Sequence, residues 1–247
     1  MVINNNEQEF TGKTLQGYLD WRYPTKEMRE RIREIDADLI YKIRSAYKGI
    51  AEKLEGGELD LSEYVSLEKL IISRSGLTKL TLGNKPKLTY FDCTYNELTD
   101  LDVSKCSNLT TLYCGKNKLT SIDFLNHLPN FEKLIQLAVS KNKLTGNLEF
   151  FSRFVNLTKL LLGNDGGASG NSFYGSLEPI KNLSQLTCFC IEGTDIDEGL
   201  EYVPSGLAER TKKSPKAQNF IFDCTAGEGK VKKIQEQLRP FNYDIEA

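Results

Sequence analysis

The 247-residue sequence predicts an α/β solenoid, in which short strands stack turn upon turn around one shared core. The pattern L-x-x-L-x-L recurs along the chain, with 21 residues between the first three copies and 23 to 33 between later ones. An asparagine follows three of the copies at the same position, and a leucine comes two residues after each asparagine. A single turn cannot bury its own apolar residues, so stacking is needed to close the core.

The individual turns follow from the same pattern. The copies start at Leu67, Leu88, Leu109, Leu134, Leu157 and Leu186, with a weaker seventh at Asn219 and a degenerate turn at 57–66. Each copy is predicted to hold one short strand whose apolar side chains point inward. The asparagine side chain is expected to bond backbone groups at the following bend, at Asn96, Asn117 and Asn142. Together the copies predict a right-handed arc of about seven turns.

The pattern with its asparagine resembles the leucine-rich repeat, whose consensus is L-x-x-L-x-L-x-x-N/C-x-L. The head YLDWRYPTKEMRERI (18–32) and the stretches LEGGELDLSEY (54–64) and GSLEPIKNLSQL (175–186) resemble a large group of fungal leucine-rich repeat proteins, abundant in mycorrhizal fungi. In that group the head runs almost directly into the first turn, whereas residues 38–51 intervene here. The resemblance implies a leucine-rich repeat fold and, by analogy, interaction functions; it carries over no catalytic residues.

Both ends are predicted to be capped by helices, because a terminal turn would otherwise expose its core. Thr25 is a candidate N-cap, and apolar residues recur at three- and four-residue steps from Ile32 to Leu54, which describes one helix stripe over 25–55. An earlier helix is expected over 14–21 and a short one over 229–241. The predicted domains are a flexible N-terminus (1–13), a helical N-terminal cap (14–56), the solenoid (57–227), and a C-terminal capping helix with a tail (228–247).

Composition narrows the classes of function. The formal net charge is −2, with acidic and basic residues mixed, which argues against nucleic acid as a partner. No apolar run is long enough for a transmembrane helix, and the N-terminus lacks the order of a signal peptide, so a cytoplasmic protein without membrane contact is expected. Six cysteines in such a chain indicate free thiols in a reducing compartment.

Residues that resemble parts of catalytic motifs are weak evidence for an active site in this sequence. The stretch GKT at 12–14 lacks the glycine-rich cradle of a phosphate-binding loop, because Glu7 holds the required glycine position. The only histidine, His127, excludes most histidine-based triads and multi-histidine metal sites by count. No catalytic residue, metal ligand or cofactor is therefore predicted, and a thiol-dependent enzyme is kept as a remote alternative.

Repeat position separates the cysteines into two groups. The group expected in the core, as small buried hydrophobes, is Cys93, Cys106, Cys114 and Cys224. Cys188 and Cys190 instead face outward from one strand, about 7 Å apart, if their repeat starts at Leu186. A competing start at Leu183 would bury Cys188. The outward pair fits either a thiol pair or two ligands of a soft metal ion.

Strand alternation sends the x positions of each copy outward, so that stacked turns form columns on one concave face. Tyrosines and exposed apolar residues suit protein contact surfaces, although aromatic pairing across strands explains tyrosines as well. The candidate binding residues on this face are Tyr90, Asp92, Tyr95, Tyr113, Lys116, Lys141 and Leu161.

These observations favour a non-catalytic scaffold that binds a protein or peptide partner through the concave face. The alternative is an adaptor or substrate-recognition subunit that docks a second protein through the N-terminal helices, with contacts at Ile40, Tyr41 and Tyr47. The glycine-rich loop 163–175 is expected to be exposed and mobile. The basic cluster in 205–218 is either a solvated loop or a docking site for an acidic partner.

Overall fold

The computed structural model describes residues 12–38, 55–164, 170–204, 207 and 222–223. The chain divides into two compact units: unit 1 comprises Met1–Leu109 and Asp123–Pro129, and unit 2 comprises Thr110–Ile122 and Asn130–Ala247. Within the described residues, no helix is both long and apolar enough to cross a membrane.

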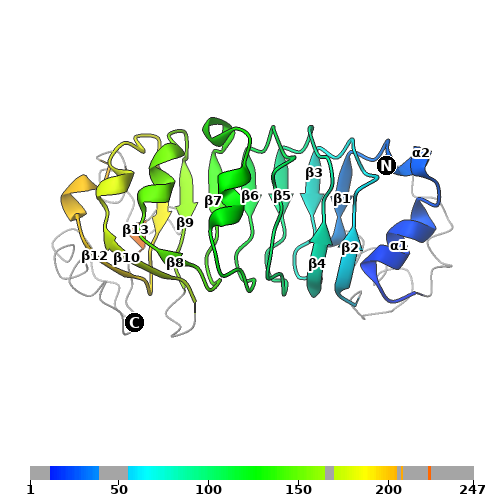
Figure 1. The fold of residues 1–247 in the computed structure, drawn as a ribbon, viewed down its shortest axis with the longest axis horizontal. Helices are drawn as coiled ribbons and strands as arrows, with labels where there is room; N and C mark the ends of the chain where they lie inside the picture. Colours follow the sequence, from blue (N-terminus) through cyan, green and yellow to red (C-terminus); the bar gives the residue numbers. More distant parts are fainter. Residues whose placement is uncertain (1–11, 39–54, 165–169, 205–206, 208–221, 224–247) are drawn as a thin grey trace. The chain divides into compact units, whose positions relative to one another are not determined.

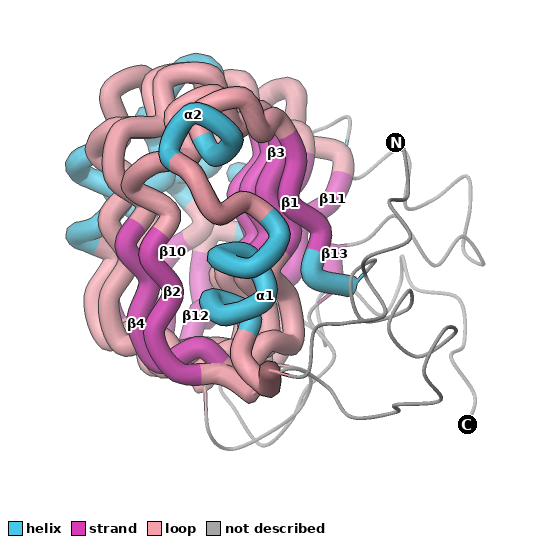
Figure 2. Tube along the Cα trace, turned by 90° about the vertical axis from the view of Figure 1, so that its right-hand side faces the viewer, coloured by secondary structure: helices cyan, strands magenta, loops and turns pink. Residues whose placement is uncertain are grey.

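Unit 1 holds strands of two parallel sheets (Figure 1). The first set consists of β1 (Glu34–Asp36), β3 (Lys69–Ile71) and β5 (Tyr90–Asp92). The second set is the pair β2 (Gly57–Asp60) and β4 (Leu77–Thr81). Figure 2 shows this pair on the opposite side of the unit from β1 and β3. Each turn therefore passes through both sets, and its apolar residues meet between them.

Unit 2 repeats the arrangement with more strands. The first set, in parallel order, is β6 (Thr111–Tyr113), β7 (Gln136–Ala138), β9 (Lys159–Leu161), β11 (Cys188–Cys190) and β13 (Phe222–Asp223). The second set is β8 (Thr145–Gly146), β10 (Ser172–Ser176) and β12 (Asp195–Glu198).

Short 3₁₀ helices occur between the strands. Unit 1 contains η2 (Asp123–His127), and unit 2 contains η3 (Phe131–Lys133), η4 (Glu149–Arg153), η5 (Glu178–Ile180) and η6 (Leu200–Tyr202). Phe151 of η4 is fully buried against Phe154 and Phe173, with ring centroids 6.5 and 5.6 Å away. Aromatic side chains thus fill the core beneath the longer turns of unit 2.

The central residue of each first-set strand points into the core, as the repeat pattern predicts. These residues are 0–3% exposed: Ile35, Leu70 and Phe91 in unit 1, and Leu112, Leu137, Leu160 and Phe189 in unit 2. Burying a side chain of this size contributes about 1.5–3 kcal/mol. Most of the strand residues on either side point outward and are only half-buried, which is the alternation of a strand with one covered face.

A buried asparagine stabilises the bend that follows β5 in unit 1, as predicted. The Nδ2 group of Asn96 donates to the carbonyl oxygens of Ile72 and Cys93, both at 2.9 Å. Its Oδ1 atom accepts from the backbone N–H groups of Ser75 and Leu77, at 3.1 and 2.9 Å. One side chain therefore joins two successive turns and supplies partners for buried backbone groups.

The same device recurs in unit 2, where the prediction for Asn117 and Asn142 is also confirmed. The Nδ2 group of Asn142 donates to the carbonyl oxygens of Cys114 and Val139, at 3.0 and 2.9 Å. Its Oδ1 atom accepts from the backbone N–H group of Leu119 at 3.0 Å. Asn117 donates to the Cys114 carbonyl oxygen at 3.1 Å. We call these bend side chains the asparagine ladder.

The next rung of the ladder is Asn171, which the sequence pattern did not identify. Its Nδ2 group donates to the carbonyl oxygens of Val139 and Leu162, both at 2.9 Å, and its Oδ1 atom accepts from Leu144 N–H at 3.1 Å. Asn164, Asn171 and Phe173 are all buried. The expectation of an exposed loop over 163–175 is therefore wrong at these positions, because both asparagines bond backbone groups and Phe173 packs in the core. Residues 165–169 lie outside the described part.

Two helices precede the first strand of unit 1. Helix α1 (Leu15–Arg22) begins after Thr14, whose hydroxyl oxygen accepts from Gly17 N–H at 3.0 Å. Helix α2 (Lys26–Arg29) begins after Thr25, whose hydroxyl oxygen accepts from Met28 N–H at 3.3 Å. The earlier helix and the N-cap at Thr25 are thus confirmed.

The predicted helix stripe over 25–55 is wrong where the structure describes it. Helix α2 ends at Arg29, and Ile35 lies in β1, paired with Leu70 of β3. Ile35 and Ala37 also satisfy the two-residue period of a strand, and pairing with β3 favours that alternative over the local helical spacing. The later residues of the stripe, up to Leu54, lie outside the described part, as does the helix expected over 229–241.

Strand β1 shows where the extra residues of the N-terminal part belong. Residue 34 pairs with residue 69, an offset of 35, whereas residue 58 of β2 pairs with residue 79 of β4, an offset of 21. The 14 additional residues therefore fall between β1 and β2, inside a turn that β1 begins. The segment 38–51, which separates the head from the repeats in the sequence, has this length.

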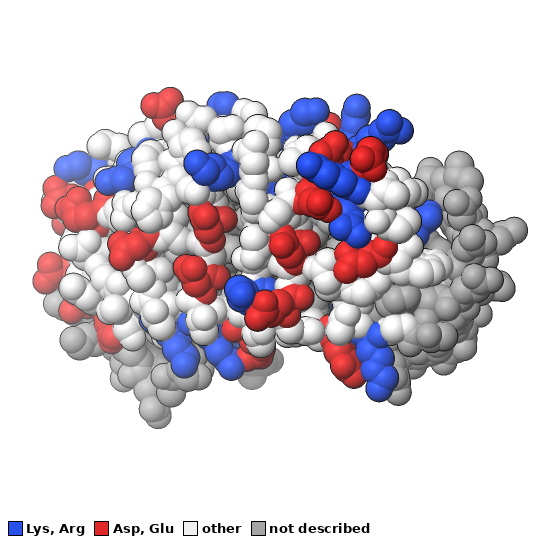
Figure 3. Space-filling view, turned by 45° about the vertical axis from the view of Figure 1, so that its right-hand side comes forward, with Lys and Arg blue, Asp and Glu red and all other residues white. Residues whose placement is uncertain are grey.

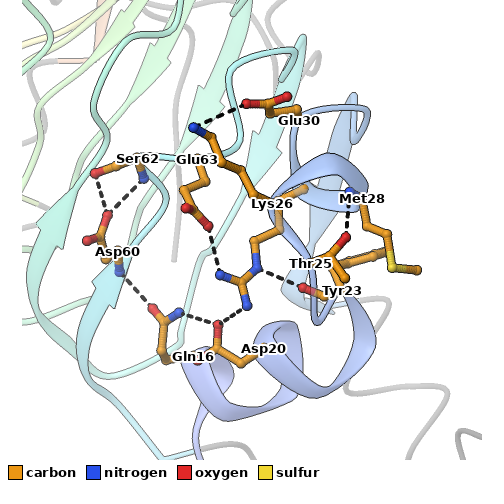
Figure 4. A network of polar contacts seen from close by, with 11 residues as sticks. Gln16, Asp20, Tyr23, Thr25, Lys26, Met28, Glu30, Asp60, Ser62 and Glu63 are labelled. Atoms are coloured by element: carbon orange, nitrogen blue, oxygen red, sulfur yellow. Dashed lines mark hydrogen bonds and ion pairs between the residues drawn. The ribbon is translucent and has the colours of Figure 1, made fainter.

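A polar network fastens the two helices to the turn that contains β2 (Figure 4). The Arg29 guanidinium donates to the Glu63 carboxylate at 2.8 Å, to the Tyr23 carbonyl oxygen at 2.7 Å, and lies 3.2 Å from the Asp20 carboxylate. Gln16 extends the network by donating to Asp20 at 3.0 Å. Charge-assisted contacts to several elements at once fix the helices in place.

Candidate protein-binding face

The outward residues of the first-set strands form a surface that we call the strand face. In unit 1 these residues are Glu34, Asp36, Lys69, Ile71, Tyr90 and Asp92. Parallel register places Lys69 beside Glu34 and Tyr90, and Ile71 beside Asp36 and Asp92. Adjacent strands are about 4.8 Å apart, so neighbouring side chains are within contact range.

The strand face of unit 1 carries more acidic than basic groups. The Lys69 ammonium lies 2.7 Å from the Glu34 carboxylate, and this hydrogen bond raises the pKa of Lys69. Asp92 accepts from the backbone N–H and hydroxyl groups of Thr94, at 2.9 and 2.7 Å. Asp38, just beyond β1, accepts from the Ser73 hydroxyl at 3.2 Å. These carboxylates are therefore held in fixed positions at the ends of the strands.

The predicted binding residues of unit 1 lie where expected. Tyr90 and Asp92 are half-buried on β5, and Tyr95 is 42% exposed beyond its end. The Arg74 guanidinium stacks on the Tyr95 ring, 4.3 Å from its centroid. Tyr95 is thus presented as a flat aromatic surface with a cation on it, which is a favourable arrangement for a protein contact.

In unit 2 the strand face is built around Tyr113. Its hydroxyl donates to the Gln136 side-chain oxygen on the next strand. The Lys159 ammonium lies 5.8 Å from the centroid of the Tyr113 ring. Leu161, two residues after Lys159, is half-buried on the same strand. Predicted residues Tyr113 and Leu161 thus share the outward side of these strands with Gln136 and Lys159.

The predicted residues Lys116 and Lys141 lie at the bends that follow β6 and β7. Both are half-buried, and both have positive φ, 55° and 54°. The backbone N–H of Lys116 donates to the Ser140 carbonyl oxygen at 2.8 Å, and that of Lys141 donates to the Gly163 carbonyl oxygen at 3.2 Å. These bonds to the next turn hold each lysine in a backbone conformation that side chains adopt at a cost of about 1–2 kcal/mol.

Unit 1 shows the same backbone conformation before its bend residues. Arg74 and Tyr95 have φ values of 54° and 57°. Glycine adopts this conformation without strain, yet the chain keeps long side chains here in both units. Backbone strain of this kind is a recognised feature of functional positions, so these residues are candidates for a contact role.

The cysteines are placed as the repeat pattern predicts wherever the structure describes them. Cys93, Cys106 and Cys114 are 0–2% exposed, and burial raises the pKa of the Cys106 thiol to about 12. Cys188 and Cys190 are half-buried on either side of the buried Phe189. The repeat therefore starts at Leu186, and the competing start at Leu183 is wrong. Cys224 lies outside the described part.

Sequence reasoning missed the acidic residues Glu34 and Asp36. They lie within the stretch that was assigned to a helix, so they were not expected on the strand face. The signal that identifies them is the alternation in EIDAD (34–38), which matches KLIIS (69–73) with apolar residues at the second and fourth positions. Within the part of the chain that the structure describes, no group of three His, Cys, Asp or Glu residues is suited to hold a metal ion.

Stacked parallel strands, an offset of 21 residues between turns and the asparagine ladder together define a leucine-rich repeat solenoid. No protein-family model matches the sequence, and no curated protein matches it. Among solved structures, PEPR1 in complex with AtPEP1 is 20% identical, with a TM-score of 0.48; the match covers 65% of this chain and 22% of that chain. This chain thus spans about a fifth of the PEPR1 chain.

Two internalins of Listeria monocytogenes are also similar in structure. Internalin C2 is 18% identical with a TM-score of 0.45, and the match covers 70% of this chain and 76% of that chain. Internalin inlF is 19% identical with a TM-score of 0.42, and the match covers 73% of this chain and 59% of that chain. The strand register and the asparagine ladder of this chain define its fold.

Proposed function

We propose that this chain is a non-catalytic scaffold that binds a protein or peptide through the strand face. The supporting observation is that the inward and outward residues of the first-set strands differ in kind. Inward residues form a core that is almost fully buried, whereas outward residues are tyrosines, lysines, carboxylates and short apolar groups at a regular spacing. Such a surface presents many side chains at a regular spacing, which suits an extended partner.

The proposal is consistent with what two of the similar structures contain. The PEPR1 structure holds AtPEP1, and the HAESA structure from Arabidopsis holds the peptide hormone IDA together with the co-receptor SERK1. Peptide binding by this chain is a proposal of its own, because its identity to those proteins is 20% or less. Membership of the fungal group and a cytoplasmic location likewise remain predictions from the sequence.

Alanine substitution of two tyrosines tests the proposal. The variants Tyr90→Ala and Tyr113→Ala remove one outward side chain from each unit and leave the core intact. Proteins captured by the native chain from its own cells should be captured about tenfold less by these variants, as expected when an aromatic contact is lost. Quantitative mass spectrometry of the captured proteins provides the measurement.

A matched control comes from the other sheet of unit 2. Tyr174 on β10 is 52% exposed, so Tyr174→Ala removes the same side chain from a different surface. This variant should capture the same proteins as the native chain. Retention of every partner by both strand-face variants, with normal thermal stability, contradicts the proposal.

The adaptor alternative depends on Ile40, Tyr41 and Tyr47, which lie outside the described part. Deletion of residues 1–55 would not test it cleanly, because the deletion also removes β1 from the first set of unit 1. A triple alanine variant at the three positions keeps β1. Loss of all captured proteins in that variant, with full retention in the tyrosine variants, favours the adaptor.

A further inference from the structure

The strand face of unit 2 has few acidic residues, unlike a surface on which acidic and basic residues alternate. None of the outward positions of β6, β7, β9 and β11 is acidic; they are Thr111, Tyr113, Gln136, Ala138, Lys159, Leu161, Cys188 and Cys190. The acidic residue of this set is Asp223 of β13, which is in register with Cys190. Lys116 and Lys141 add two cations at the bends, and the half-buried Glu192, just past β11, adds one anion. By contrast, the surface seen in Figure 3 intersperses basic and acidic residues.

Lys159 is held over this face by its contact with the tyrosine. Its ammonium lies over the Tyr113 ring, two strands away, and the ring is itself anchored by the hydrogen bond to Gln136. The lysine side chain therefore crosses β7 and remains half-buried. A cation held over an aromatic ring keeps much of its capacity to meet a carboxylate, because the ring does not neutralise it.

Lys116 and Lys141 occupy equivalent positions in neighbouring turns. Their backbones are about one strand spacing apart, roughly 4.8 Å, because β6 and β7 pair in register. A carboxylate-bearing segment that reaches this bend region would therefore meet two lysines from neighbouring turns.

We propose that the strand face of unit 2 binds an extended, acidic segment of a partner protein. Carboxylates of the segment contact Lys116, Lys141 and Lys159, and an apolar side chain of the segment packs against Tyr113 or Leu161. This inference rests on the proposed function and specifies the chemistry of its partner. A protein segment is favoured over nucleic acid because the whole chain has a net charge of −2, and because lysines beside Tyr113 and Leu161 match a few carboxylates with an apolar side chain better than a continuous phosphate backbone.

The motifs GKNK and SKNK provide matched pairs of lysines for the test. In each motif the first lysine, Lys116 or Lys141, is half-buried before the ladder asparagine, and the second, Lys118 or Lys143, is exposed after it. The double variants Lys116→Glu/Lys141→Glu and Lys118→Glu/Lys143→Glu therefore change the net charge equally. A fluorescent oligo-glutamate peptide serves as the probe, and fluorescence anisotropy measures its binding at low and at physiological salt.

The native chain should bind the oligo-glutamate peptide, and the binding should weaken as salt rises. Reversal at Lys116 and Lys141 should weaken binding about tenfold or more, while reversal at Lys118 and Lys143 should change it by about twofold or less. If reversal at 116 and 141 prevents folding, judged by thermal denaturation, the corresponding double alanine variant replaces it.

Equal losses in the two double variants would overturn the inference, because net charge alone would then explain binding. No loss in either variant, or no binding of the peptide by the native chain, would overturn it as well. Tighter binding of a single-stranded oligonucleotide with the same lysine dependence would assign the face to nucleic acid instead. The capture experiment with the tyrosine variants tests the proposed function independently of the lysine variants. The proposed function therefore stands if only the peptide experiment fails.

Discussion

The strand faces of unit 1 and unit 2 share one backbone geometry but carry opposite charge. Unit 1 presents Glu34, Asp36 and Asp92 beside Lys69 on its strands, whereas β6, β7, β9 and β11 of unit 2 present Lys159 and no acidic residue. The inward positions of the two units are nearly identical in burial and in chemical type. The repeat therefore fixes the inward side chains and leaves the outward ones available for recognition.

The two units also accommodate extra residues at the same step of a turn. In unit 1, the 14 additional residues come between β1 and β2. In unit 2, the additional residues come between Asn164, just after β9, and the ladder residue Asn171. Pairing of the strands on either side sets the register in both cases, so lengthening the connection costs little.

The largest expected effect comes from breaking the ladder in either unit. Asn96→Ala and Asn171→Ala each leave several buried backbone groups without partners, so each should destabilise the protein by about 3 kcal/mol or more. The two costs should be similar, because both side chains bond two carbonyl groups and two N–H groups. Chemical denaturation measures them.

Asn126→Ala is the control, since Asn126 is exposed on η2 and should cost about 0.5 kcal/mol or less. A cost for Asn171→Ala that is as small as this control would contradict the assignment of Asn171 to the ladder. The two units would then be alike in their strands but not in their bend asparagines.

A second difference is that unit 1 buries one of its lysines completely. The Lys85 ammonium donates to the carbonyl oxygens of Leu61, at 2.8 Å, and of Leu82. Burial lowers the pKa of Lys85 to about 8, from an ordinary value of 10.5. Between these two values the unfolded chain holds a proton that the folded chain has released. Lys85 should therefore increase stability as pH rises through this window, and contribute no slope below it.

Comparison with Lys85→Met isolates this contribution. Burial raises the pKa of the Cys106 thiol to about 12, so that group acts in the opposite direction and lowers stability as pH rises. Subtracting the two pH profiles cancels most of the cysteine contribution. Identical pH profiles of the native chain and Lys85→Met would contradict the lowered pKa of Lys85. NMR of the Lys85 ε-carbon in the native protein gives a second check, and a titration midpoint near 10.5 would also contradict it.

Much of the fold follows from the sequence because the repeat is periodic. Leu70, Leu112 and Leu137 are predicted as core by spacing alone, and Asn96 and Asn142 by their constant distance from the strand. Periodicity fails where chain is inserted. Strand β1 was mistaken for helix because its partner, β3, is 35 residues away, and Asn171 was missed because extra residues separate it from β9.

The binding face is less predictable for a physical reason. Alternation shows which residues point outward, as for Tyr90 and Leu161, but contacts among side chains depend on the folded structure. The placement of Lys159 over Tyr113 spans two strands and has no local signature. The charge difference between the units likewise emerges only when β1 joins the sheet and brings its carboxylates to the face.

The last prediction concerns the cysteine thiols and has the smallest expected effect on stability. The rate at which each thiol is alkylated reports whether a reagent reaches the strand face. Cys188 and Cys190 should react with iodoacetamide in the folded protein at rates within about tenfold of an exposed thiol, because their strand positions point outward. Cys93 and Cys114 are fully buried and should react only through rare opening, at least about a thousandfold more slowly. Peptide mapping separates each site, and denatured protein, in which every thiol reacts, sets the upper limit. Protection of Cys188 and Cys190 equal to that of Cys93 would mean that β11 is covered in solution, which would remove that strand from the surface available to a partner.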